Sequence, residues 1–247
     1  MKVLVIGDSC KDVFVYGSCS RMAPAAPVPV FIPQYLKNNK GMAGNVYENF
    51  RSLGVVCDLI TNTSEITKTR YIDQTTNHMI IRVDSGEEKI ERAADLDKIE
   101  YSDYNAVIIS DYNKGFLAEQ DIQFISEHHE LVFMDTKKLL GDWGKAVDFI
   151  KINEEEHNRT KHLLTDKTWL DEKLIVTVGS NGCLYNGEHF PVEKVEIKDL
   201  TGAGDSFLTG FVYKYLETKD ASKSLKFANE CATIVVQQKG VNTINDI

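Results

Sequence analysis

The chain has 247 residues, which is enough for one large domain that holds a core without disulfides or a structural metal. Its 28 Lys and Arg residues against 37 Asp and Glu residues give a formal net charge of −9, which disfavours broad contact with nucleic acid or an anionic membrane. Five widely spaced cysteines without a CxxC pair fit a reducing compartment better than a disulfide framework or a zinc site. With no signal peptide or membrane span expected, the sequence predicts a cytoplasmic protein.

Short apolar runs alternate with helical patterns along the chain. Continuous runs rich in β-branched residues are typical of strands buried on both faces of a parallel sheet. In chain order, the expected strands are Val3–Ile6, Val55–Ile60, Ala106–Ile109, Leu131–Met134, Val147–Ile152 and Leu174–Val178. The expected helices are Ala43–Leu53, Glu119–His129, Glu154–Leu164, Ala203–Glu217 and Ala221–Gln238. This alternation predicts a doubly wound α/β sheet that binds ligands at the carboxyl ends of its strands.

Two segments break this alternation. The first contains most of the prolines of the chain, so Val28–Phe31 is expected as an edge strand or an extended arm. The second, Thr69–Asp84, is expected as a strand pair with Met79–Val83 as its clearest strand. Together the two segments form either a small β flap above the main sheet or a pair of surface loops, and the pattern alone leaves both open.

The most informative stretch is Asp199–Phe207, in which Gly202 and Gly204 bracket Ala203 directly before an amphipathic helix. Backbone N–H groups at the start of a helix bind anions. Asp205, in the first turn of that helix, either complements the helix dipole or acts as a general base beside a bound phosphate. The spacing alone favours the simpler role of complementing the dipole.

This stretch reads DLTGAGDSF and closely resembles the DTGAGD signature of ribokinase-like sugar kinases, the PfkB family, with Leu200 as an extra residue. The resemblance implies that the amides of Gly202, Ala203 and Gly204 stabilise charge on the transferring phosphoryl group. It also implies that Asp205 takes the proton of the sugar hydroxyl.

A second signature lies near the N-terminus. Gly41–Val46, followed by Asn49, Leu53 and Gly54, resembles the family's GGAANVAxNxxxLG, with Met42 in place of a glycine. The resemblance implies that Gly41 and Asn45 contact the sugar. Without it, the stretch is a glycine-rich turn that leads into a helix.

The remaining matches narrow the resemblance to heptose-7-phosphate kinases, which form the kinase half of bacterial ADP-heptose synthase. Gly7–Gly17 and Ser20–Val30 are similar to the opening of those enzymes, and the likeness extends from Val3 to about Thr243. Further matched motifs are Ser110–Gly115, Asp135–Lys137, the NxxE motif Asn153–Glu156 and the TxGxxG turn Thr177–Gly182.

The resemblance assigns further site residues, and each also has a simpler structural explanation. Asp12 is expected to bind sugar hydroxyls, although an Asp there also suits a turn. The ATP-binding residues are expected to be Lys137, Asn153, Glu156, Thr177, Gly179, Gly182 and Asn229. Glu156 is also expected to hold Mg²⁺ through water, although three successive Glu residues suit a helix N-terminus as well. For Lys137 and Asn229 a surface or structural role is equally open.

One departure from the family pattern stands out. After Val55–Ile60 the chain passes through residues 61–66 directly into the next extended segment, where the family normally inserts a helix and a strand. We expect the active site to survive this loss, whereas sugar selection and support of the flap are in doubt. No nucleotidyltransferase sequence follows Ile247, so only the kinase half of a bifunctional enzyme is expected.

Taken together, the resemblance implies a ribokinase-like three-layer α/β sandwich, with a central mostly parallel sheet and a small β lid. We expect a single domain over residues 1–247 with lid segments at about 12–34 and 69–84. The expected activity is Mg²⁺- and ATP-dependent phosphorylation of a heptose 7-phosphate at its anomeric hydroxyl, in a homodimer that associates through its lids. The alternatives are a family member that acts on another sugar or sugar phosphate, and a shortened relative that only binds nucleotide or sugar.

Overall fold

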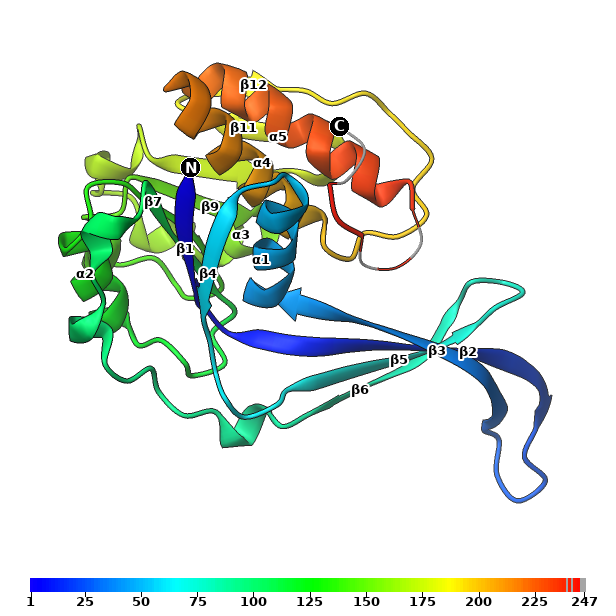
Figure 1. Cartoon of the computed structure of the whole chain (residues 1–247). Helices are drawn as coiled ribbons and strands as arrows, with labels where there is room; N and C mark the ends of the chain where they lie inside the picture. Colours follow the sequence, from blue (N-terminus) through cyan, green and yellow to red (C-terminus); the bar gives the residue numbers. More distant parts are fainter. Residues whose placement is uncertain (239, 241, 245–247) are drawn as a thin grey trace.

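The centre of the computed structural model, which describes residues 1–238, 240 and 242–244, is an eight-stranded sheet in the order β12-β11-β10-β9-β8-β7-β1-β4 (Figure 1). The parallel strands are β1 (Lys2–Gly7), β4 (Val56–Ile60), β7 (Ala106–Asp111), β8 (Val132–Thr136), β9 (Phe149–Asn153) and β10 (Leu174–Thr177). Two short strands, β11 (Cys183–Tyr185) and β12 (Glu188–Phe190), add an antiparallel edge. The mostly parallel sheet expected from the sequence is confirmed, and the antiparallel edge was not expected.

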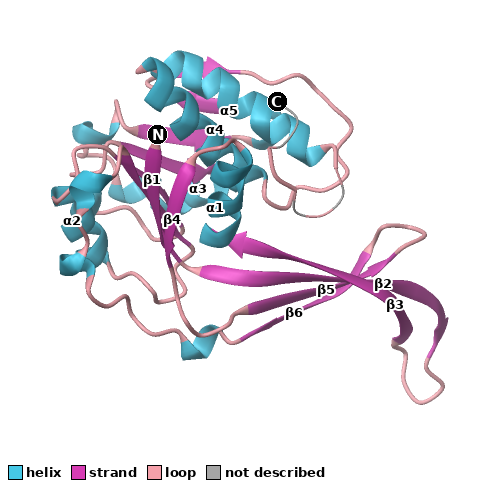
Figure 2. Ribbon diagram, viewed as in Figure 1, coloured by secondary structure: helices cyan, strands magenta, loops and turns pink. Residues whose placement is uncertain are grey.

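Helices cover both faces of this sheet, as expected for an α/β sandwich (Figure 2). On one face lie α1 (Ala43–Ser52), α4 (Ala203–Thr218) and α5 (Ala221–Val236), and on the other lies α2 (Glu119–Glu127). The helix expected to run from Glu154 to Leu164 is shorter, because α3 (Glu154–Thr160) gives way to a 3-10 turn at Lys161–Leu163. Further 3-10 turns lie at Glu87–Lys89, Leu96–Lys98, Tyr101–Asp103, Asp142–Gly144, Thr168–Leu170 and Gly179–Asn181.

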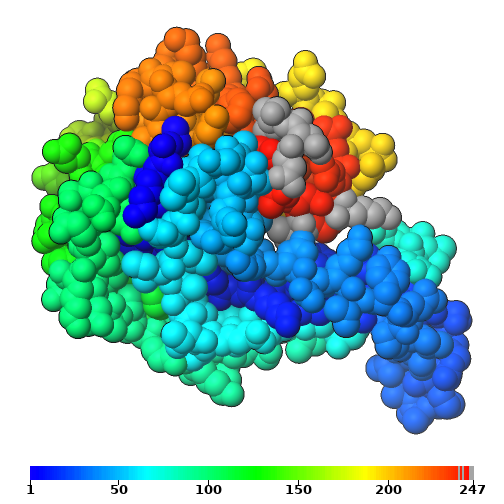
Figure 3. All heavy atoms as spheres, in the orientation of Figure 1, coloured from blue at the N-terminus to red at the C-terminus, as the bar shows by residue number. Residues whose placement is uncertain are grey.

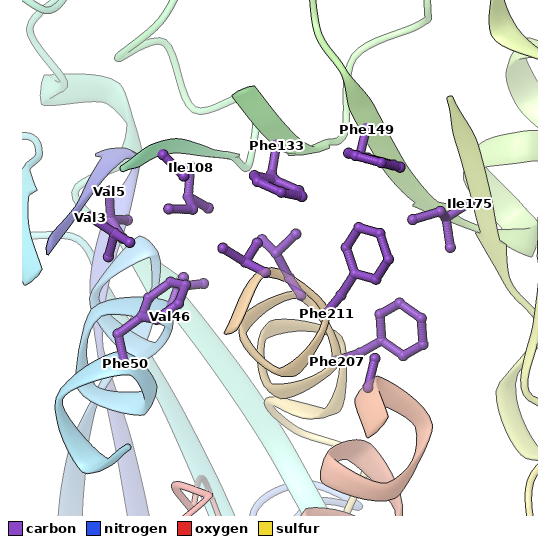
Figure 4. Close-up of a cluster of buried hydrophobic side chains, with 14 of the residues drawn as sticks. Val3, Val5, Val46, Phe50, Ile108, Phe133, Phe149, Ile175, Phe207 and Phe211 are labelled. Atoms are coloured by element: carbon purple, nitrogen blue, oxygen red, sulfur yellow. The ribbon is translucent and has the colours of Figure 1, made fainter. Parts of the chain in front are cut away.

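The core consists of two apolar clusters, one on each face of the main sheet. Figure 4 shows the cluster beneath α1 and α4, where Phe211 of α4 packs edge-on against Phe133 and Phe149 of the sheet, with ring centroids 5.7 and 5.1 Å apart. Edge-to-face aromatic pairs add to the free energy gained by burial. This packing fixes the position of α4, and therefore the place where its first turn meets the carboxyl end of the sheet.

A second, four-stranded sheet in the order β3-β2-β5-β6 projects away from this body as a lid (Figures 1 and 3). Its strands are β2 (Ser9–Met22), β3 (Pro29–Met42), β5 (Thr67–Asp73) and β6 (Met79–Ser85). The strand pair expected in the second segment is confirmed as β5 and β6, and the flap, rather than a pair of loops, is present. The expected lid segment at about 12–34 covers most of β2, although no separate strand was expected there, and β3 extends well beyond the expected Val28–Phe31.

The lid joins the main sheet through short connections. Gly7 ends β1 where a Cβ atom would lie 1.9 Å from the Ser110 carbonyl oxygen, so only glycine allows β1 and β7 to pair at this point. Asn62, between β4 and β5, holds the start of β2, because its side chain bonds the Ser9 N–H at 2.8 Å and the Ser9 carbonyl at 3.1 Å. Residues 61–66 contain neither helix nor strand, so the expected direct passage into the lid is confirmed, and β4 forms an edge of the main sheet.

Candidate active site

The first turn of α4 carries Asp205, whose side chain is buried with only 4% of its surface exposed. One carboxylate oxygen accepts a hydrogen bond from Asn45 Nδ2 at 2.8 Å, and the other accepts one from the Tyr112 hydroxyl at 2.7 Å. The structure therefore brings together Asn45 and Asp205, which the two family signatures had singled out. Tyr112 lay within a matched motif, but the sequence gave it no role.

The surroundings of Asp205 adjust its acidity. Burial raises its pKa to about 6, and the nearby Asp135 carboxylate acts in the same direction, while the hydrogen bonds from Asn45 and Tyr112 and the Lys151 ammonium oppose the rise. The carboxyl group is therefore ionised at neutral pH but more basic than an ordinary aspartate. A pKa just below the working pH is the property expected of a general base.

The turn before Asp205 leads into the N-terminus of α4. Gly202 adopts a left-handed conformation, with φ of 86°, that favours glycine, and Thr201 donates from both N–H and Oγ1 to Asp199, at 2.9 and 2.7 Å. The first amides of a helix have no acceptor within the helix, although the Ala203 N–H here donates to the Leu200 carbonyl at 3.3 Å. The extra residue of the motif thus supplies a carbonyl group that helps to close the turn.

A buried ion pair that the sequence did not predict lies beside this turn. Lys151 Nζ donates to Asp135 Oδ2 at 2.7 Å, and both side chains are about 5% exposed or less. A Cβ atom on Gly204 would lie 2.9 Å from Lys151 Nζ, so the ammonium packs directly against the glycine. Asp135 Oδ1 is buried without a hydrogen-bond partner among the described residues. Lys151 lies within a strand expected to be buried, where a charge needs a partner, but no role was expected for it from the sequence.

A cavity of 370 Å³ opens on one side of the turn. It is lined by four expected nucleotide contacts, Thr177, Gly179, Gly182 and Asn229, together with Ala203 and Gly204 of the turn. The remaining wall is largely apolar, with Val195, Ile197, Leu200, Phe207 and Val236 among its side chains. An apolar slot that ends at a helix N-terminus suits a planar base with a phosphate chain.

A second cavity, of 480 Å³, opens on the other side, and Asp205 lines it. Asp12 and Asn45 also line it, as expected for sugar contacts. Gly41 lies behind Asp12 and is not part of the lining, and a Cβ atom there would lie 2.1 Å from Asp12 Oδ2. Met42 has a positive φ of 61°, a range that favours glycine, which explains why the family signature has a glycine at this position.

Six basic side chains line this second cavity, against two acidic ones. They are Lys68, Arg70, Arg82, Lys114, Lys137 and Arg159, and the acidic residues are Asp12 and Asp205. Ion pairs neutralise four of the basic groups: Arg70 with Asp12, Arg82 with Asp84, Lys114 with Glu87, and Lys137 with Glu156.

The remaining two basic groups, Lys68 and Arg159, have no carboxylate within ion-pair distance among the described residues. Lys68 is only 7% exposed, and its Nζ reaches Met42 Sδ at 3.0 Å. The sequence shows the alternation of Lys68 and Arg70, but not the strand pairing that brings Arg82 beside them. Lys68 and Arg70 alternate along β5, and Arg70 pairs directly with Arg82 of β6, so all three reach one face of the lid.

Asn153 and Glu156 line neither cavity but form a capping box at the start of α3. Asn153 Oδ1 accepts the Glu156 N–H at 2.8 Å, and Glu156 Oε2 accepts the Asn153 N–H at 2.7 Å. The other Glu156 oxygen pairs with Lys137, which does line the second cavity. The helix-start explanation of this motif is therefore correct, and it leaves one oxygen of Glu156 directed toward the site.

Comparisons with known proteins agree with this geometry. A family model described as "pfkB family carbohydrate kinase" matches residues 42–247. The chain is 31% identical to a "Bifunctional protein HldE" from Helicobacter pylori, covering 97% of this chain, and 29% identical to one from Nitratiruptor, covering 98%. It spans 63% of the length of each of these relatives. The Helicobacter alignment is 301 positions long, more than the 247 residues of the chain, so that relative has residues with no counterpart here.

Solved structures show the same fold at low identity. A ribokinase from Thermotoga maritima superposes with a TM-score of 0.71 at 16% identity, over 97% of this chain and 94% of that one. A nucleoside kinase from Methanocaldococcus jannaschii gives 0.72 at 18% identity, over 97% and 93%. A ribokinase from Arabidopsis thaliana, complexed with ribose and ATP, gives 0.68 at 16% identity, over 98% and 94%. The expected ribokinase-like fold is confirmed.

Proposed function

The chain belongs to the pfkB family of carbohydrate kinases, and on that premise we propose that it transfers the γ-phosphoryl group of ATP to the anomeric hydroxyl of a sugar phosphate of the heptose 7-phosphate type. The observation that carries the proposal is the position of the α4 turn between two cavities. Ala203 and Gly204 face the apolar, nucleotide-shaped cavity, whereas Gly202 and Asp205 face the basic one. A base and an anion-binding turn therefore lie where two substrates would meet.

The reaction follows from this arrangement. The acceptor hydroxyl in the basic cavity gives its proton to the Asp205 carboxylate while its oxygen bonds to the γ-phosphorus, and the bond to the β–γ bridging oxygen breaks to release ADP. The amides of the Gly202–Gly204 turn and the dipole of α4 stabilise the charge on the phosphoryl oxygens. Phosphoryl transfer depends mainly on positioning and charge neutralisation, which these groups supply.

The residues present also fit a magnesium ion. Mg²⁺ keeps several of its waters and uses few protein ligands, so a fully protein-built cage is not required. Two carboxylates lie near Lys137 at the cavity wall. Glu156 forms an ion pair with it, and the charge of Asp135 acts to raise the pKa of Lys137. Asp135 Oδ1 has no hydrogen-bond partner among the described residues. These oxygens would hold waters of Mg²⁺, which neutralises the phosphate chain when bound.

The basic half of the second cavity supports a phosphorylated sugar. A buried ammonium without a counter-ion is costly, and a phosphate on the substrate would supply the missing negative charge to Lys68, with the exposed Arg159 as a further partner in the same cavity lining. The heptose assignment rests on the likeness to the HldE relatives. A family member for another sugar phosphate remains the second candidate, because the cavity lining favours a phosphate without specifying its sugar.

A substrate panel tests the proposal. The purified chain is assayed for ADP release with heptose 7-phosphate, hexose 6-phosphates and unphosphorylated sugars. We expect heptose 7-phosphate to give the highest kcat/KM and unphosphorylated sugars to react at least about 100-fold less well, because they leave Lys68 uncompensated. Preference for a hexose phosphate would favour the second candidate, and no turnover with any sugar would favour a binding protein.

The Lys68→Met variant tests the phosphate contact. We expect a KM for the phosphorylated sugar raised about 100-fold and an unchanged KM for ATP, because Lys68 lines only the basic cavity. The matched control is Lys11→Met, since Lys11 lies on the same sheet but is exposed and lines neither cavity. Equal KM values in the two variants would contradict the assignment.

We also propose that the chain forms a homodimer through its lid. Strand register places Leu36, Val15, Tyr71 and Ile81 in one row across all four lid strands, on the face opposite Asp12 and Arg70. Leu36 and Ile81 are 60% and 55% exposed. An exposed apolar row on a projecting sheet suits a two-fold interface.

All five cysteines are free, which supports a reducing, cytoplasmic location. Among the described helices, none is both long and apolar enough to cross a membrane.

A further inference from the structure

The loop that follows β7 brings a tyrosine hydroxyl to the base. Tyr112 lines the basic cavity, and its hydroxyl donates to Asp205 Oδ1 at 2.7 Å. Asn45 donates to the other carboxylate oxygen, so the two bonds together fix the rotation of the Asp205 side chain. Each carboxylate oxygen can accept two hydrogen bonds, so both keep room for an acceptor hydroxyl.

The loop that carries Tyr112 is itself held by a buried carboxylate. Asp8, which is 0% exposed and follows β1, accepts the Tyr112 N–H at 2.7 Å and the Phe116 N–H at 3.2 Å. Asn113 continues the loop in a left-handed conformation with φ of 55°, and its N–H donates to Asp111 Oδ1 at 3.1 Å. Tyr112 is therefore fixed at its backbone before any substrate binds, as preorganisation requires.

The ring of Tyr112 also meets two basic groups. Lys68 Nζ of the lid lies 5.4 Å from the ring centroid, and Lys137 Nζ lies 5.2 Å from it. Ammonium groups at this distance are attracted to an aromatic face. Tyr112 therefore contacts Lys68 of the lid, Lys137 at the cavity wall and Asp205 at once. Asn45, the other side chain that bonds Asp205, has no aromatic ring with which to contact Lys68.

From this geometry we propose that Tyr112 is a positioning residue of the phosphoryl transfer, which holds the Asp205 carboxylate toward the acceptor hydroxyl and links its orientation to the lid. The inference rests on the proposed kinase function. The Tyr112 hydroxyl is a dependable donor, because burial and the neighbouring Asp205 charge raise its pKa well above the usual value. Its hydrogen bond in turn lowers the pKa of Asp205.

The charged and titratable groups that face Asp205 come from several elements. They are Tyr112 after β7, Asp135 of β8, Lys137 after β8, Lys151 of β9 and Cys10 of β2. Burial raises the Cys10 pKa to about 12, so this thiol does not titrate near neutral pH. Removing the Tyr112 hydroxyl leaves the other four groups in place, so a change in the titration of Asp205 would report the lost hydrogen bond.

The test is Tyr112→Phe, which keeps the ring and its contacts with both lysines. We expect kcat/KM for the sugar substrate to fall about 10-fold at pH 6 and to recover as the pH is raised to 9, because the Asp205 pKa rises when the hydrogen bond is lost. The KM for ATP should not change. The control is Tyr101→Phe, which removes a buried hydroxyl that donates to the Leu96 carbonyl at 3.1 Å, away from both cavities.

A measurement independent of turnover completes the test. The Asp205 carboxyl carbon, assigned by its loss in Asp205→Asn, is titrated by NMR in wild type and in Tyr112→Phe. A higher titration midpoint in Tyr112→Phe supports the proposal even if wild type phosphorylates no sugar, in which case only the proposed function fails. An unchanged midpoint, or an activity loss of equal size at every pH, overturns the proposal.

Discussion

At the scale of single residues, the buried charge of Asp205 is expected to lower the stability of the fold while serving the proposed activity. Its pKa is about 6 in the folded chain against an ordinary value of 3.8, so the folded state binds this proton more tightly than the unfolded state does. Between those two values stability is lost as the pH rises, and above pH 6 the folded chain carries the full cost of a buried charge. The ionised form that the proposed base needs is thus the form that destabilises the fold.

Asp205→Asn should therefore have two opposite effects. We expect kcat to fall about 10²–10⁴-fold, the usual contribution of a general base. We also expect the free energy of unfolding at pH 8 to increase by about 1–3 kcal/mol, because the amide removes the buried charge, while its oxygen can accept from Asn45 and its NH2 group can donate to the Tyr112 hydroxyl oxygen. Thermal melts at pH 8 and pH 4 check the second effect, and the gain should shrink at pH 4. An equal or lower melting temperature at pH 8 would contradict it.

The position of Gly204, beside the Lys151 ammonium, leaves no room for a side chain. Gly204→Ala places a methyl group 2.9 Å from the ammonium of Lys151, which cannot move freely because it is buried and bound to Asp135. We expect a stability loss of about 1–3 kcal/mol from overpacking, together with weaker ATP binding. Denaturant unfolding and nucleotide titration measure the two effects.

The matched control for this change is Gly144→Ala. Its new Cβ atom would meet Ile150 at an ordinary 3.6 Å, and the residue does not have a positive φ. We expect nearly unchanged ATP binding in this variant. If Gly204→Ala binds ATP as tightly as the control does, the space beside Lys151 is not a constraint on the anion-binding turn.

At the scale of elements, the Asn153–Glu156 motif has a structural role that can be tested apart from the proposed contact with Mg²⁺. Asn153→Ala removes the cap of a seven-residue helix, and we expect a loss of about 1–2 kcal/mol in the free energy of unfolding. Asn158→Ala, on the same helix but exposed, is the control and should cost much less. Chemical denaturation of both variants decides, and equal stabilities would show that the capping box does not stabilise α3.

The elements that the sequence predicted well are those with a continuous apolar run. Strands such as β1 and β7 are buried on both faces, so each reads as an uninterrupted hydrophobic segment. The long lid strand β2 was expected only as part of a lid segment, because it lacks a continuous apolar run and is interrupted by a bulge near Gly17. Likewise α3 stops short, since nothing in its composition marks the change to a 3-10 turn.

The site divides in the same way. Residues within contiguous signatures, such as Asp205 and Asn45, could be found from the sequence, because each motif is local. Lys68 and Lys151 could not be found so readily, since they reach the site through sheet pairing across the lid and through a buried strand position. Cross-strand register is a property of the fold, and one sequence specifies it only weakly.

At the scale of the whole molecule, charge is distributed unevenly. The chain carries a net charge of −9, yet the lining of one cavity has six basic and two acidic side chains. A basic cavity in an acidic surface concentrates the field at its mouth and selects small anions over extended ones. The lid supplies Lys68, Arg70 and Arg82 of this lining, so we expect the geometry of the lid to determine how the proposed sugar phosphate is held.

If sugar binding depends on the geometry of the lid, then the association of two lids in a dimer should affect it. The row Leu36, Val15, Tyr71 and Ile81 lies on the outer face of the sheet, while the inner face of the same four strands bears Asp12, Lys68 and Arg70. A four-stranded sheet that projects alone has one face without a core, and covering the outer row by a second copy would rigidify the inner face. Dimerisation and sugar affinity are therefore expected to change together.

Ile81→Asp tests this coupling. Two buried carboxylates at a two-fold interface repel each other. We therefore expect the mass measured by light scattering at micromolar concentration to fall from twice the chain mass to a value near 27.8 kDa. The KM for the sugar substrate should rise while the KM for ATP stays nearly constant, because lid residues line the basic cavity and not the apolar one. The control is Val56→Asp, at a 60% exposed position on the edge strand β4 outside the lid, which should remain dimeric.

A wild-type mass near 27.8 kDa that does not change when sugar and nucleotide are added would rule out the dimer. A monomeric Ile81→Asp with wild-type sugar affinity would instead show that the lid holds its geometry without a partner.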